Sequence, residues 1–389
     1  MSISVHLDRT GPDRTGTARR DGETPDPAAT LRVLMATRYD RLGASSRLRL
    51  LQYVAPLAAY GIDCTPRPFL SNGYVAALYE NRSRLPAILA AYARAPALHR
   101  AIREHDIVWI EKELLPFLPA PFERTLLGPD RKFILDFDDA WFLRYGGEAG
   151  NTIRNRLLRT ALGGKFPALL RQAALTIVAN ETLRDWASRA GACNILVLPT
   201  VVDLAHYPVT PPRPSPVFTI GWIGTPVTAP YLNRLAPSLQ TLARESPTEL
   251  LIVGAPGFTI DGITCRHLPW SETTEAATIA AMDVGIMPLP DDAWARGKSG
   301  YKLIQYMAAA RPTIGSPVGA NTTIIADGET GFLATTDSDW TTRLRQLRDN
   351  PALRQALSTA ARTRVTHHYS LQSTAPQLAH AIRALATPS

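Results

Sequence analysis

The chain has 389 residues, 45% of them hydrophobic, which is enough for two ordinary domains with buried cores and too evenly mixed for a disordered protein. Its formal net charge is +8, but the excess is scattered arginine, without zinc-finger spacing or an aromatic-basic RNA signature, so no nucleic-acid partner is expected. The charge leaves anionic substrates and an acidic membrane face as candidate partners.

The first 30 residues are polar and lack the apolar core of a signal peptide, so we expect a disordered tail there. No run in the sequence approaches the roughly 18 apolar residues that a membrane helix needs. The cysteines, Cys64, Cys193 and Cys265, are odd in number and far apart, which argues against a disulfide framework and against a metal cluster. These features together favour a cytoplasmic protein.

A strand, a polar turn and a helix follow the tail. Leu31 to Ala36 is an apolar run typical of a strand, Gly43 to Ser46 is the turn, and Arg47 to Tyr60 has the pattern of a helix. The glycine and serines of the turn either cap the helix or leave free amides that face a ligand, and the residues alone favour neither interpretation.

Strands and helices then alternate along the chain, and this order predicts parallel sheets in an α/β fold. The proline-rich segment 208–216 interrupts the alternation and is the predicted linker. We therefore expect one domain at 31–207 and a second at 217–366. A closing helical segment at 367–389 is long enough to cross back to the first domain.

Three carboxylates follow one predicted strand. The apolar residues Phe133 to Leu135 lead directly into Asp136, Asp138 and Asp139. Carboxylates this close together need water, cations or hydrogen-bond donors around them. The Asp-x-Asp spacing suits magnesium or manganese, a position in a cleft suits hydroxyl binding or general-base chemistry, and the plain alternative is a helix cap with solvated acids. All three remain open, and the metal site is the least favoured.

The stretch from Pro288 to Asn321 has the pattern of a strand end, a glycine loop, a helix that begins near Gly300, and a second strand with a glycine turn. On that helix Lys298, Lys302 and Gln305 share one face, and the opposite, apolar side is expected to pack on the sheet. The helix dipole, the free amides and the lysines favour an anionic ligand, first of all phosphate. The alternative is a solvated polar face, although open α/β sheets place their ligands at such strand-loop-helix junctions.

Six short motifs in one order give the chain a family resemblance. They are Ser45-Ser46-Arg47, Asp136 to Ala140, Pro199 to Asp203, Gly221 to Gly224, Gly297 to Ala308 and Ser316 to Asn321. From about 31 to 366 the chain resembles the GT-B glycosyltransferases of family 4, also called group 1. The resemblance implies two Rossmann-like domains that face each other across a cleft, with a sugar-nucleotide donor held mainly by the second.

The donor signature of this chain departs from that family. Gln305 stands where the family has a ribose-binding glutamate, and Gly297 stands where it has a glutamate that binds sugar hydroxyls. Gly300 keeps the glycine at the helix start, whose backbone faces the phosphates in the family.

The cations of the family's first loop in the second domain are also absent. An arginine and a lysine usually neutralise the pyrophosphate there, and Gly224, Thr225 and Thr228 occupy the loop in this chain. Lys298 and Lys302 are the nearest remaining cations, and each suits the role of a point charge on phosphate.

The resemblance implies transfer of a sugar from a nucleotide diphosphate to an acceptor hydroxyl, with retention at the anomeric carbon and with no required metal or other cofactor. The predicted catalytic residues are Asp138, Asp139 and Lys302. The predicted donor-binding residues are Gly224, Thr225, Lys298, Gly300, Lys302, Gln305 and Asn321. The predicted acceptor-binding residues are Ser45, Ser46 and Arg47.

The expected partners are a sugar nucleotide and a saccharide or lipid-linked acceptor, with peripheral contact at an acidic inner membrane face and a role in surface polysaccharide or glycolipid assembly. Two alternatives use the same scaffold. A sugar-nucleotide epimerase would bind the donor without an acceptor, and a GT-B-like binding protein would have lost catalysis together with the signature glutamates.

Overall fold

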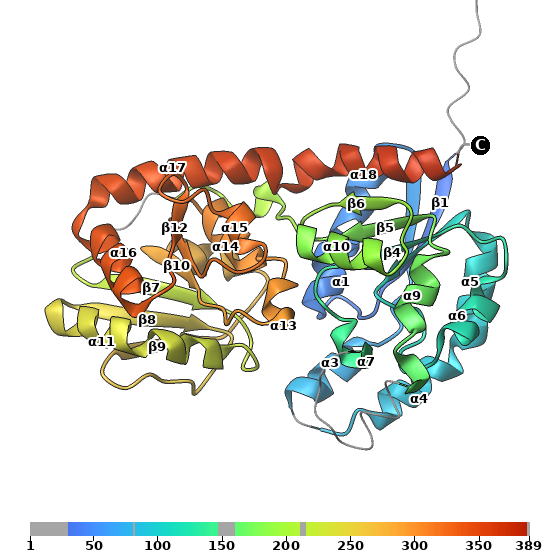
Figure 1. Cartoon of the computed structure of the whole chain (residues 1–389), viewed down its shortest axis with the longest axis horizontal. Coiled ribbons are helices and arrows are strands. Elements are labelled where there is room, and N and C mark those ends of the chain that lie inside the picture. The colour runs from blue at the N-terminus through green and yellow to red at the C-terminus, as the bar shows by residue number, and fades with distance from the viewer. Residues whose placement is uncertain (1–29, 81, 147–159, 211–214, 387–389) are drawn as a thin grey trace, which may run out of the picture.

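The computed structural model describes residues 30–80, 82–146, 160–210 and 215–386. The predicted tail therefore lies outside the described residues except at its last position, and so does the middle of the predicted linker. Two six-stranded sheets organise the chain, one in each half (Figure 1). We call the parts built on them the N-terminal unit and the C-terminal unit.

The sheet of the N-terminal unit has the order β2-β1-β3-β4-β5-β6, and every neighbouring pair is parallel. Its strands are β1 (Leu31–Ala36), β2 (Ile62–Pro66), β3 (Ile107–Glu111), β4 (Phe133–Phe137), β5 (Leu175–Val178) and β6 (Ile195–Val197). Every residue of β3, β4 and β5 is buried, because helices cover both faces of the sheet. The polar residues that follow β1, β3 and β4 therefore meet at one edge of this sheet.

The sheet of the C-terminal unit has the order β12-β11-β10-β7-β8-β9 and is also parallel throughout. Its strands are β7 (Phe218–Ile223), β8 (Thr248–Val253), β9 (Thr264–Leu268), β10 (Val284–Met287), β11 (Thr313–Gly315) and β12 (Gly331–Leu333). The strand order reverses beside β7 and β10, and the loops that leave these two strands contain the predicted phosphate site.

The helices of the N-terminal unit are α1 (Ala44–Arg49), η1 (Leu51–Tyr53), α2 (Val54–Ala58), α3 (Asn72–Tyr79), α4 (Leu85–Ala93), α5 (Ala95–Glu104), α6 (Ala120–Leu127), α7 (Leu143–Gly146), α9 (Lys165–Leu170) and α10 (Glu181–Arg189). The helix expected to begin at Arg47 begins three residues earlier, so Ser45 and Ser46 lie inside its first turn. The prediction that they form a turn before the helix was wrong in this detail.

The helical elements after β6 are η2 (Leu204–His206), η3 (Ala229–Leu235), α11 (Ala236–Glu245), α12 (Glu275–Ala280), α13 (Ala293–Arg296), α14 (Tyr301–Ala308), α15 (Asn321–Ile324), α16 (Asp337–Asp349), α17 (Pro351–His368) and α18 (Leu371–Ala386). The helix predicted near Gly300 is α14. Its expected amphipathic division is incomplete, because it packs against β10, β11, α12 and α17 and all its residues from Leu303 onward are buried.

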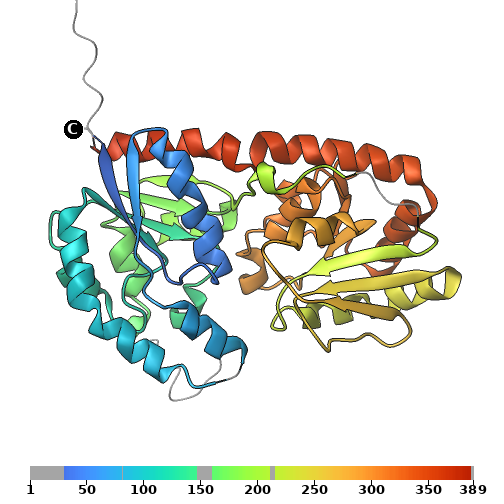
Figure 2. The ribbon, with the colours of Figure 1, turned by 180° about the vertical axis from the view of Figure 1, so that it is seen from behind.

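The last two helices join the units. α17 packs on the core of the C-terminal unit through Ala361 and Val365, whereas Leu378 and Ile382 of α18 belong to the core of the N-terminal unit. The two helices run one after the other along the same side of both units (Figures 1 and 2). At the break between them, the hydroxyl of Ser370 accepts a hydrogen bond from the Ser373 amide at 3.1 Å and so caps α18.

No helix among the described residues combines the length and the apolar composition that crossing a bilayer would require.

Candidate active site

The residues from Asp136 to Ala140 at the end of β4 form a turn, which we call the acidic turn. Its first carboxylate has a structural role. Asp136 is 1% exposed and accepts a hydrogen bond from Arg49 Nε at 2.9 Å and another from the Trp109 indole at 3.2 Å. Arg49 is the last residue of α1, and its guanidinium also donates to the Leu198 carbonyl at 2.7 Å. This buried ion pair fixes α1 above the sheet, so Asp136 orients the site and does not face a ligand.

Lys112, the residue after β3, is the principal partner of the acidic turn. Its ammonium nitrogen lies 2.9 Å from Asp138 Oδ1 and 4.0 Å from Asp139 Oδ1, and it donates to the Ser45 hydroxyl at 2.8 Å. The Ser45 hydroxyl in turn donates to the other oxygen of Asp138. The backbone of Lys112 has φ +63°, a strained conformation for a residue with a side chain, which aims the lysine at the turn.

The two aspartates of the turn have opposite pKa shifts. Burial acts to raise the pKa of Asp138, but the Lys112 ion pair and the Ser45 hydrogen bond hold it below its ordinary value. Burial raises the pKa of Asp139, and the neighbouring charge of Asp138 raises it further. Asp138 is thus kept ionised, while Asp139, with 27% of its side chain exposed, is the more easily protonated and the more accessible of the two.

Lys112 supplies positive charge to the acidic turn. Within the parts of the chain that the structure describes, no group of three or more His, Cys, Asp or Glu side chains is placed to hold a metal ion. The cation beside Asp138 is the Lys112 ammonium group, at 2.9 Å.

The three predicted acceptor-binding residues do not lie together. Ser45, on α1, contacts the acidic turn through its hydrogen bond to Asp138. Ser46 is fully buried, donates to Glu111 Oε2 at 2.5 Å and accepts from the Tyr39 amide at 2.9 Å, so its hydroxyl faces the interior. Arg47 reaches toward the C-terminal unit, where its guanidinium lies 4.9 Å from the centre of the Trp270 ring and its Nε lies 3.8 Å from Glu272.

The start of α14 carries the predicted phosphate-binding lysines. Gly300 caps the helix with φ +69°, and a Cβ there would lie 2.3 Å from Ile324 Cδ1, so a side chain is excluded by both conformation and space. Lys302, in the first turn, extends over the Trp222 ring, 5.6 Å from its centre. Neither Lys298 nor Lys302 forms an ion pair with a carboxylate of the described residues.

Burial without an anionic partner lowers the pKa of both lysines. For Lys302 burial lowers the pKa to about 8, and the nearby charge of Lys298 contributes to the fall. For Lys298 burial lowers the pKa, while Asp139 and Asp138 counteract it. An anion bound between the two ammonium groups would reverse the shift of both pKa values.

The loop from Gly297 to Gly300, which we call the lysine loop, contacts the acidic turn across the boundary between the units. A Cβ on Gly297 would lie 2.5 Å from the Cβ of Ala140, so the absence of a side chain permits the contact. Asn180, the N-cap of α10, donates through its side-chain amide to the carbonyls of Gly297 and Lys298, at 3.2 and 3.0 Å. Two motifs more than 150 positions apart thus form one site.

Gly224 and Thr225 follow β7 beside the lysines. A Cβ on Gly224 would lie 3.0 Å from Lys302 Cε, so the glycine leaves room for the lysine stem. The Thr225 amide donates to the Thr228 hydroxyl at 3.4 Å, which shapes the loop. Gly224 therefore lies against Lys302, and Thr225 follows it in the same loop.

Gln305 and Asn321 have internal partners. Gln305 is 4% exposed, and its side-chain amide donates to the Tyr207 hydroxyl at 3.2 Å; this hydroxyl donates to Glu275 at 2.7 Å. The side-chain amide of Asn321 donates to the Ser316 carbonyl at 2.9 Å, while its buried Oδ1 has no hydrogen-bond partner among the described residues. Both side chains therefore brace the loops around the lysines.

Three residues of this site were not among the predicted ones: Lys112, Asn180 and Trp222. Lys112 and Asn180 stand just after β3 and β5, and the rule that parallel strands present ligand-binding residues at their carboxyl ends could have identified them. Trp222 lies within an apolar strand, and its place in the motif from Gly221 to Gly224 is the signal that could have identified it.

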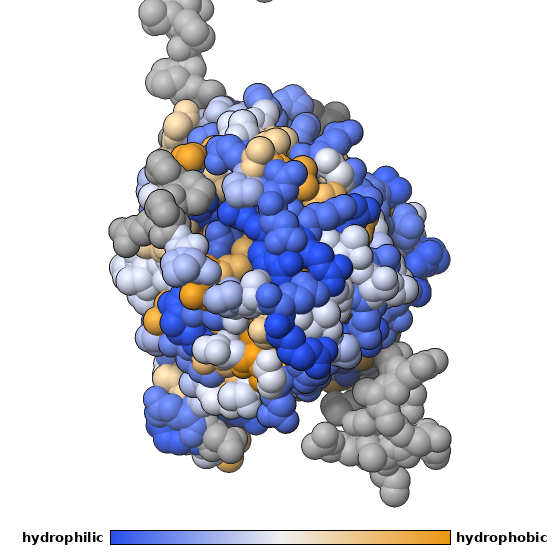
Figure 3. All heavy atoms as spheres, turned by 90° about the vertical axis from the view of Figure 1, so that its left-hand side faces the viewer, coloured by the Kyte–Doolittle hydropathy of each residue, from blue (hydrophilic) through white to orange (hydrophobic). Residues whose placement is uncertain are grey.

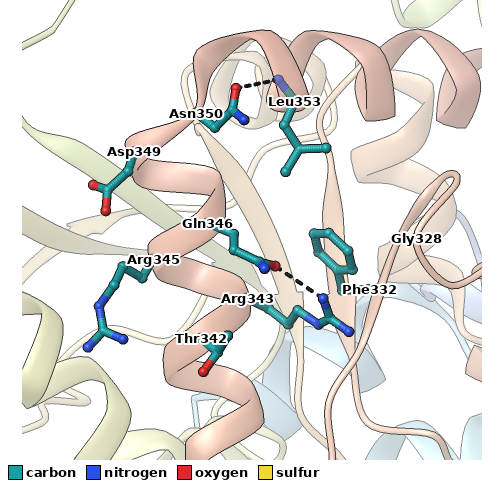
Figure 4. Close-up of a pocket in the computed structure, with 9 residues that line it drawn as sticks. All are labelled: Gly328, Phe332, Thr342, Arg343, Arg345, Gln346, Asp349, Asn350 and Leu353. Carbon is teal, nitrogen blue, oxygen red and sulfur yellow. Dashed lines mark hydrogen bonds between the residues drawn. The ribbon is translucent and has the colours of Figure 1, made fainter.

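Two cavities lie in the C-terminal unit. One, of about 350 Å³, opens between the loops that follow β10 and β11, where Pro288 and Ser316 are among its lining residues, and it adjoins the stretch predicted to bind the donor. The other, of about 510 Å³, is lined by α16 and by Phe332, whose ring lies 4.5 Å from the Arg343 guanidinium (Figure 4). This second cavity contains none of the predicted site residues, and α16 lies at the end of the molecule away from the N-terminal unit (Figure 1).

Residues 218–350 match the family model described as "Glycosyl transferases group 1". The match covers most of the C-terminal unit and includes the lysine loop, and it does not extend to the N-terminal unit. No curated protein matches the sequence.

Several solved structures share the fold over almost their whole length. A glycosyltransferase from Rickettsia africae has a TM-score of 0.67 at 14% identity, covering 92% of this chain and 100% of that one. Sucrose-phosphate synthase from Thermosynechococcus elongatus has a TM-score of 0.63 at 16% identity, covering 91% and 99% of the two chains. HepE from Anabaena, in complex with UDP-glucose, has a TM-score of 0.63 at 12% identity, covering 91% and 100%. The predicted fold class, two Rossmann-like domains of the GT-B type, is confirmed.

Proposed function

We propose that this protein is a glycosyltransferase that moves a sugar from a nucleotide diphosphate to an acceptor hydroxyl. The proposal rests on Lys298 and Lys302, two partly buried lysines at the start of α14 that form no ion pair among the described residues. The loop before this helix contacts the acidic turn of the N-terminal unit. The group 1 match over residues 218–350 and the UDP-glucose bound to the structurally similar HepE support the same donor class.

The donor diphosphate fits the lysine side of the site. Two ammonium groups, the free amides of the first turn of α14 and the helix dipole all favour negative charge at one place. Charge on the diphosphate increases as its bond to the sugar breaks, so these groups stabilise the transition state more than the ground state. The loop that begins with Gly224 lies against Lys302, and the loops held by Gln305 and Asn321 complete the donor side.

The acceptor fits the acidic side of the site. Asp139, the more accessible aspartate, orients the acceptor hydroxyl, while Asp138 stays ionised beside Lys112 and Ser45 and holds the turn in place. The acceptor oxygen forms a bond to the anomeric carbon, the bond from that carbon to the β-phosphate oxygen breaks, and the diphosphate leaves with the bonding electrons. Under the retaining course that the family resemblance implies, acceptor and leaving group share one face, and the hydroxyl proton passes to the leaving phosphate oxygen.

The setting we propose is surface polysaccharide or glycolipid assembly, with the protein in the cytoplasm at the inner membrane face. A saccharide or lipid-linked acceptor would enter from the N-terminal unit. Ser45, Ser46 and Arg47 of that unit were predicted to bind it, and Ser45 is the member of the set that contacts the acidic turn.

Ligand-induced stabilisation against heat tests the donor site directly. A nucleotide diphosphate at a hundred times its dissociation constant adds about 2.7 kcal/mol to the free energy of unfolding. We expect the shift with one nucleotide class, its loss in Lys302→Ala, and its retention in Lys132→Ala, because Lys132 is exposed and lies in the N-terminal unit. If the thermal shift persisted in Lys302→Ala, the phosphates would not bind at the start of α14.

Transfer itself is tested at the acidic turn. Asp139→Asn should lower the rate of sugar transfer strongly while donor binding, read by the thermal shift, is preserved. Full transfer activity in Asp139→Asn would exclude its assigned role.

The same assays separate the alternatives. An epimerase would interconvert donor sugars without an acceptor, and a binding protein would bind a nucleotide diphosphate with neither reaction. The acidic turn in contact with the lysine loop favours transfer, because a binding protein has no use for an aspartate kept partly exposed beside the donor.

A further inference from the structure

A group of charged side chains adjoins the acidic turn in the interior of the N-terminal unit. Its members are Arg38, Glu113, Glu123 and Lys165, and the side chain of each is at most 1% exposed. Charged side chains ordinarily stay in water, as they do on the mainly hydrophilic outer end of the C-terminal unit that Figure 3 shows. We call these four residues the buried network.

Lys165, the first residue of α9, is the centre of the buried network. Its ammonium nitrogen lies 2.7 Å from Glu113 Oε2 and 2.7 Å from Glu123 Oε1, and it donates to the Leu115 carbonyl at 2.7 Å. The Glu123 carboxylate, on α6, also accepts from the amides of Leu114 and Leu115 at 3.2 and 2.9 Å. Side chains of α6 and α9 thus fix the backbone that follows Glu113.

Glu113 connects the buried network to the acidic turn. Its Oε1 accepts from the Arg38 guanidinium at 2.6 Å and from the Trp141 indole at 3.1 Å. Trp141 directly follows Ala140, the last residue of the acidic turn. Burial acts to raise the pKa of Glu113, but the charges of Lys165 and Arg38 hold this pKa below its ordinary value, so the carboxylate stays ionised.

Lys112 lies in a strained turn between two anchored glutamates. The Glu113 amide donates to the Glu111 carbonyl at 2.7 Å, and Lys112 between them has φ +63°, as in the form of γ-turn that is rare and strained. Glu111 is held as well, because its Oε2 accepts from the Arg38 amide at 2.8 Å and from the Ser46 hydroxyl at 2.5 Å. Strain of this kind persists only where the surrounding structure fixes it, and here the side chains on both sides of Lys112 are fixed.

Stability alone does not explain the buried network. Moving each charge out of water is unfavourable, and replacing a buried ion pair by apolar residues of similar volume is often neutral or stabilising. Apolar residues could not reproduce the directions of the bonds, however. Lys165 and Arg38 hold the two oxygens of Glu113 separately, so the carboxylate and the end of the strained turn have one position.

We propose that Glu113 is a positioning residue of the transfer reaction: held by the rest of the buried network, it keeps Lys112 in the strained turn and so keeps the Lys112 ammonium group on Asp138. The acidic turn then has one conformation, in which Asp139 is left to orient the acceptor hydroxyl. The effect on transfer rests on the proposed function. The coupling between Glu113 and Lys112 is a property of the fold and can be measured without a substrate.

Urea unfolding of a double-mutant cycle tests this coupling. Lys112→Met should lower the free energy of unfolding of the wild type, because Asp138 loses its cation. In a Glu113→Gln background the same change should cost about half as much or less, because Lys112 is no longer held on Asp138. Ile62→Ala is the control background, since Ile62 is buried at the amino end of β2, the end of the sheet away from the acidic turn. There the cost of Lys112→Met should be undiminished.

Sugar transfer by the same variants tests the consequence for the reaction. Glu113→Gln should lower kcat about tenfold, while the KM for the donor and the donor-induced thermal shift stay at their wild-type values, because the lysine loop is unchanged. Ile62→Ala should keep the wild-type kcat although it is also less stable. Trp141→Phe removes only the indole hydrogen bond to Glu113 and is the milder variant if Glu113→Gln does not fold. It should lower kcat about threefold and reduce the cost of Lys112→Met in the unfolding cycle.

Additive unfolding losses of Glu113→Gln and Lys112→Met would overturn the proposal. An equal fall of kcat in Glu113→Gln and Ile62→Ala would also overturn it, because lost stability alone would then explain the slower transfer. If the wild type transferred no sugar, the proposed function would fail, whereas a non-additive unfolding cycle would still support Glu113 as the residue that positions Lys112.

Discussion

The two sides of the candidate site differ in how their charges are satisfied. On the N-terminal side, Asp136 and Asp138 have internal cations in Arg49 and Lys112. On the C-terminal side, Lys298 and Lys302 are partly buried without an ion pair among the described residues, and the pKa of each is lowered. Asp136 and Asp138 thus have a cation in the absence of a ligand, whereas neither lysine has a carboxylate within ion-pair distance among the described residues. This difference assigns the diphosphate to the second side.

The same substitution on the two sides should have opposite effects on stability. Lys112→Met leaves Asp138 and Glu111 without their nearest cation, and we expect the free energy of unfolding to fall by about 3–5 kcal/mol. Lys302→Met removes a buried charge that no carboxylate compensates, so it should be neutral or stabilising. Urea unfolding of the two variants measures both. Equal losses would mean that Lys302 has an anionic partner within the protein.

Lys302 should be important for catalysis although its removal does not lower stability. Removing its ammonium group from the developing diphosphate charge should lower kcat/KM about a hundredfold, or about 2.7 kcal/mol. Lys302→Ala, with Lys132→Ala as the control, tests this in an assay of nucleotide diphosphate release. An unchanged kcat/KM would leave Lys298 and the helix amides as the only donors to the phosphates.

Contact between the two sides should matter less than either charge. Gly297→Ala places a methyl group against Ala140, so the units must separate by a small distance. We expect about a tenfold lower kcat/KM, about 1.4 kcal/mol, with unchanged thermal stability. Ala140→Gly in the same chain should restore part of the activity. Gly164→Ala is the control, because a Cβ there meets no atom within 4 Å. An equal loss of kcat/KM in this control would mean that the loss in Gly297→Ala does not come from the contact with Ala140.

The smallest expected effect is a pH dependence of nucleotide diphosphate binding. The pKa of free Lys302 is about 8, so the lysine loses its proton as the pH rises through that value, and affinity for the diphosphate should fall severalfold between about pH 7 and pH 9. In Lys302→Arg the charge persists, and the affinity should stay constant over this range. Calorimetric titration at several pH values measures it. A flat profile in the wild type would place the diphosphate away from Lys302.

The same shift has a consequence for stability without ligand. Because the pKa of Lys302 is lower in the folded protein than in the unfolded chain, the unfolded chain binds more protons between about pH 8 and pH 10.5. This lysine therefore opposes folding below about pH 8, and its contribution becomes less unfavourable as the pH rises through that window. Lys302→Met should remove this part of the pH dependence.

The architecture could be predicted because local sequence patterns specify its strands and helices. Apolar runs followed by helices specify parallel strands, and β1 and β4 coincide with the runs at Leu31 to Ala36 and Phe133 to Leu135 recognised in the sequence. The junction at Gly300 was predictable for the same reason, since a glycine between a strand and a helix marks a backbone that other residues cannot adopt. The start of α1 was misplaced because its cap has no side-chain hydrogen bond and so leaves little signal in the sequence.

The partners of the charged residues were not predictable. The sequence showed three aspartates and two lysines, and it could not show that Lys112 pairs with Asp138 or that Ser46 and Gln305 turn inward. These pairings join residues that lie between 26 and 98 positions apart, and they depend on which strand ends meet.

The sequence by itself thus determined the two parallel sheets and the residues at their carboxyl ends, because strand periodicity and glycine conformation are local properties of the chain. Only the tertiary structure decided which charges are neutralised and which remain available. The packing of one unit against the other, through Gly297, Ala140 and Asn180, brings the acidic turn to the lysines, and burial then sets their pKa values. Solvation and distance are properties of the assembled fold, and they distinguish the supporting residues from those left free to meet a ligand.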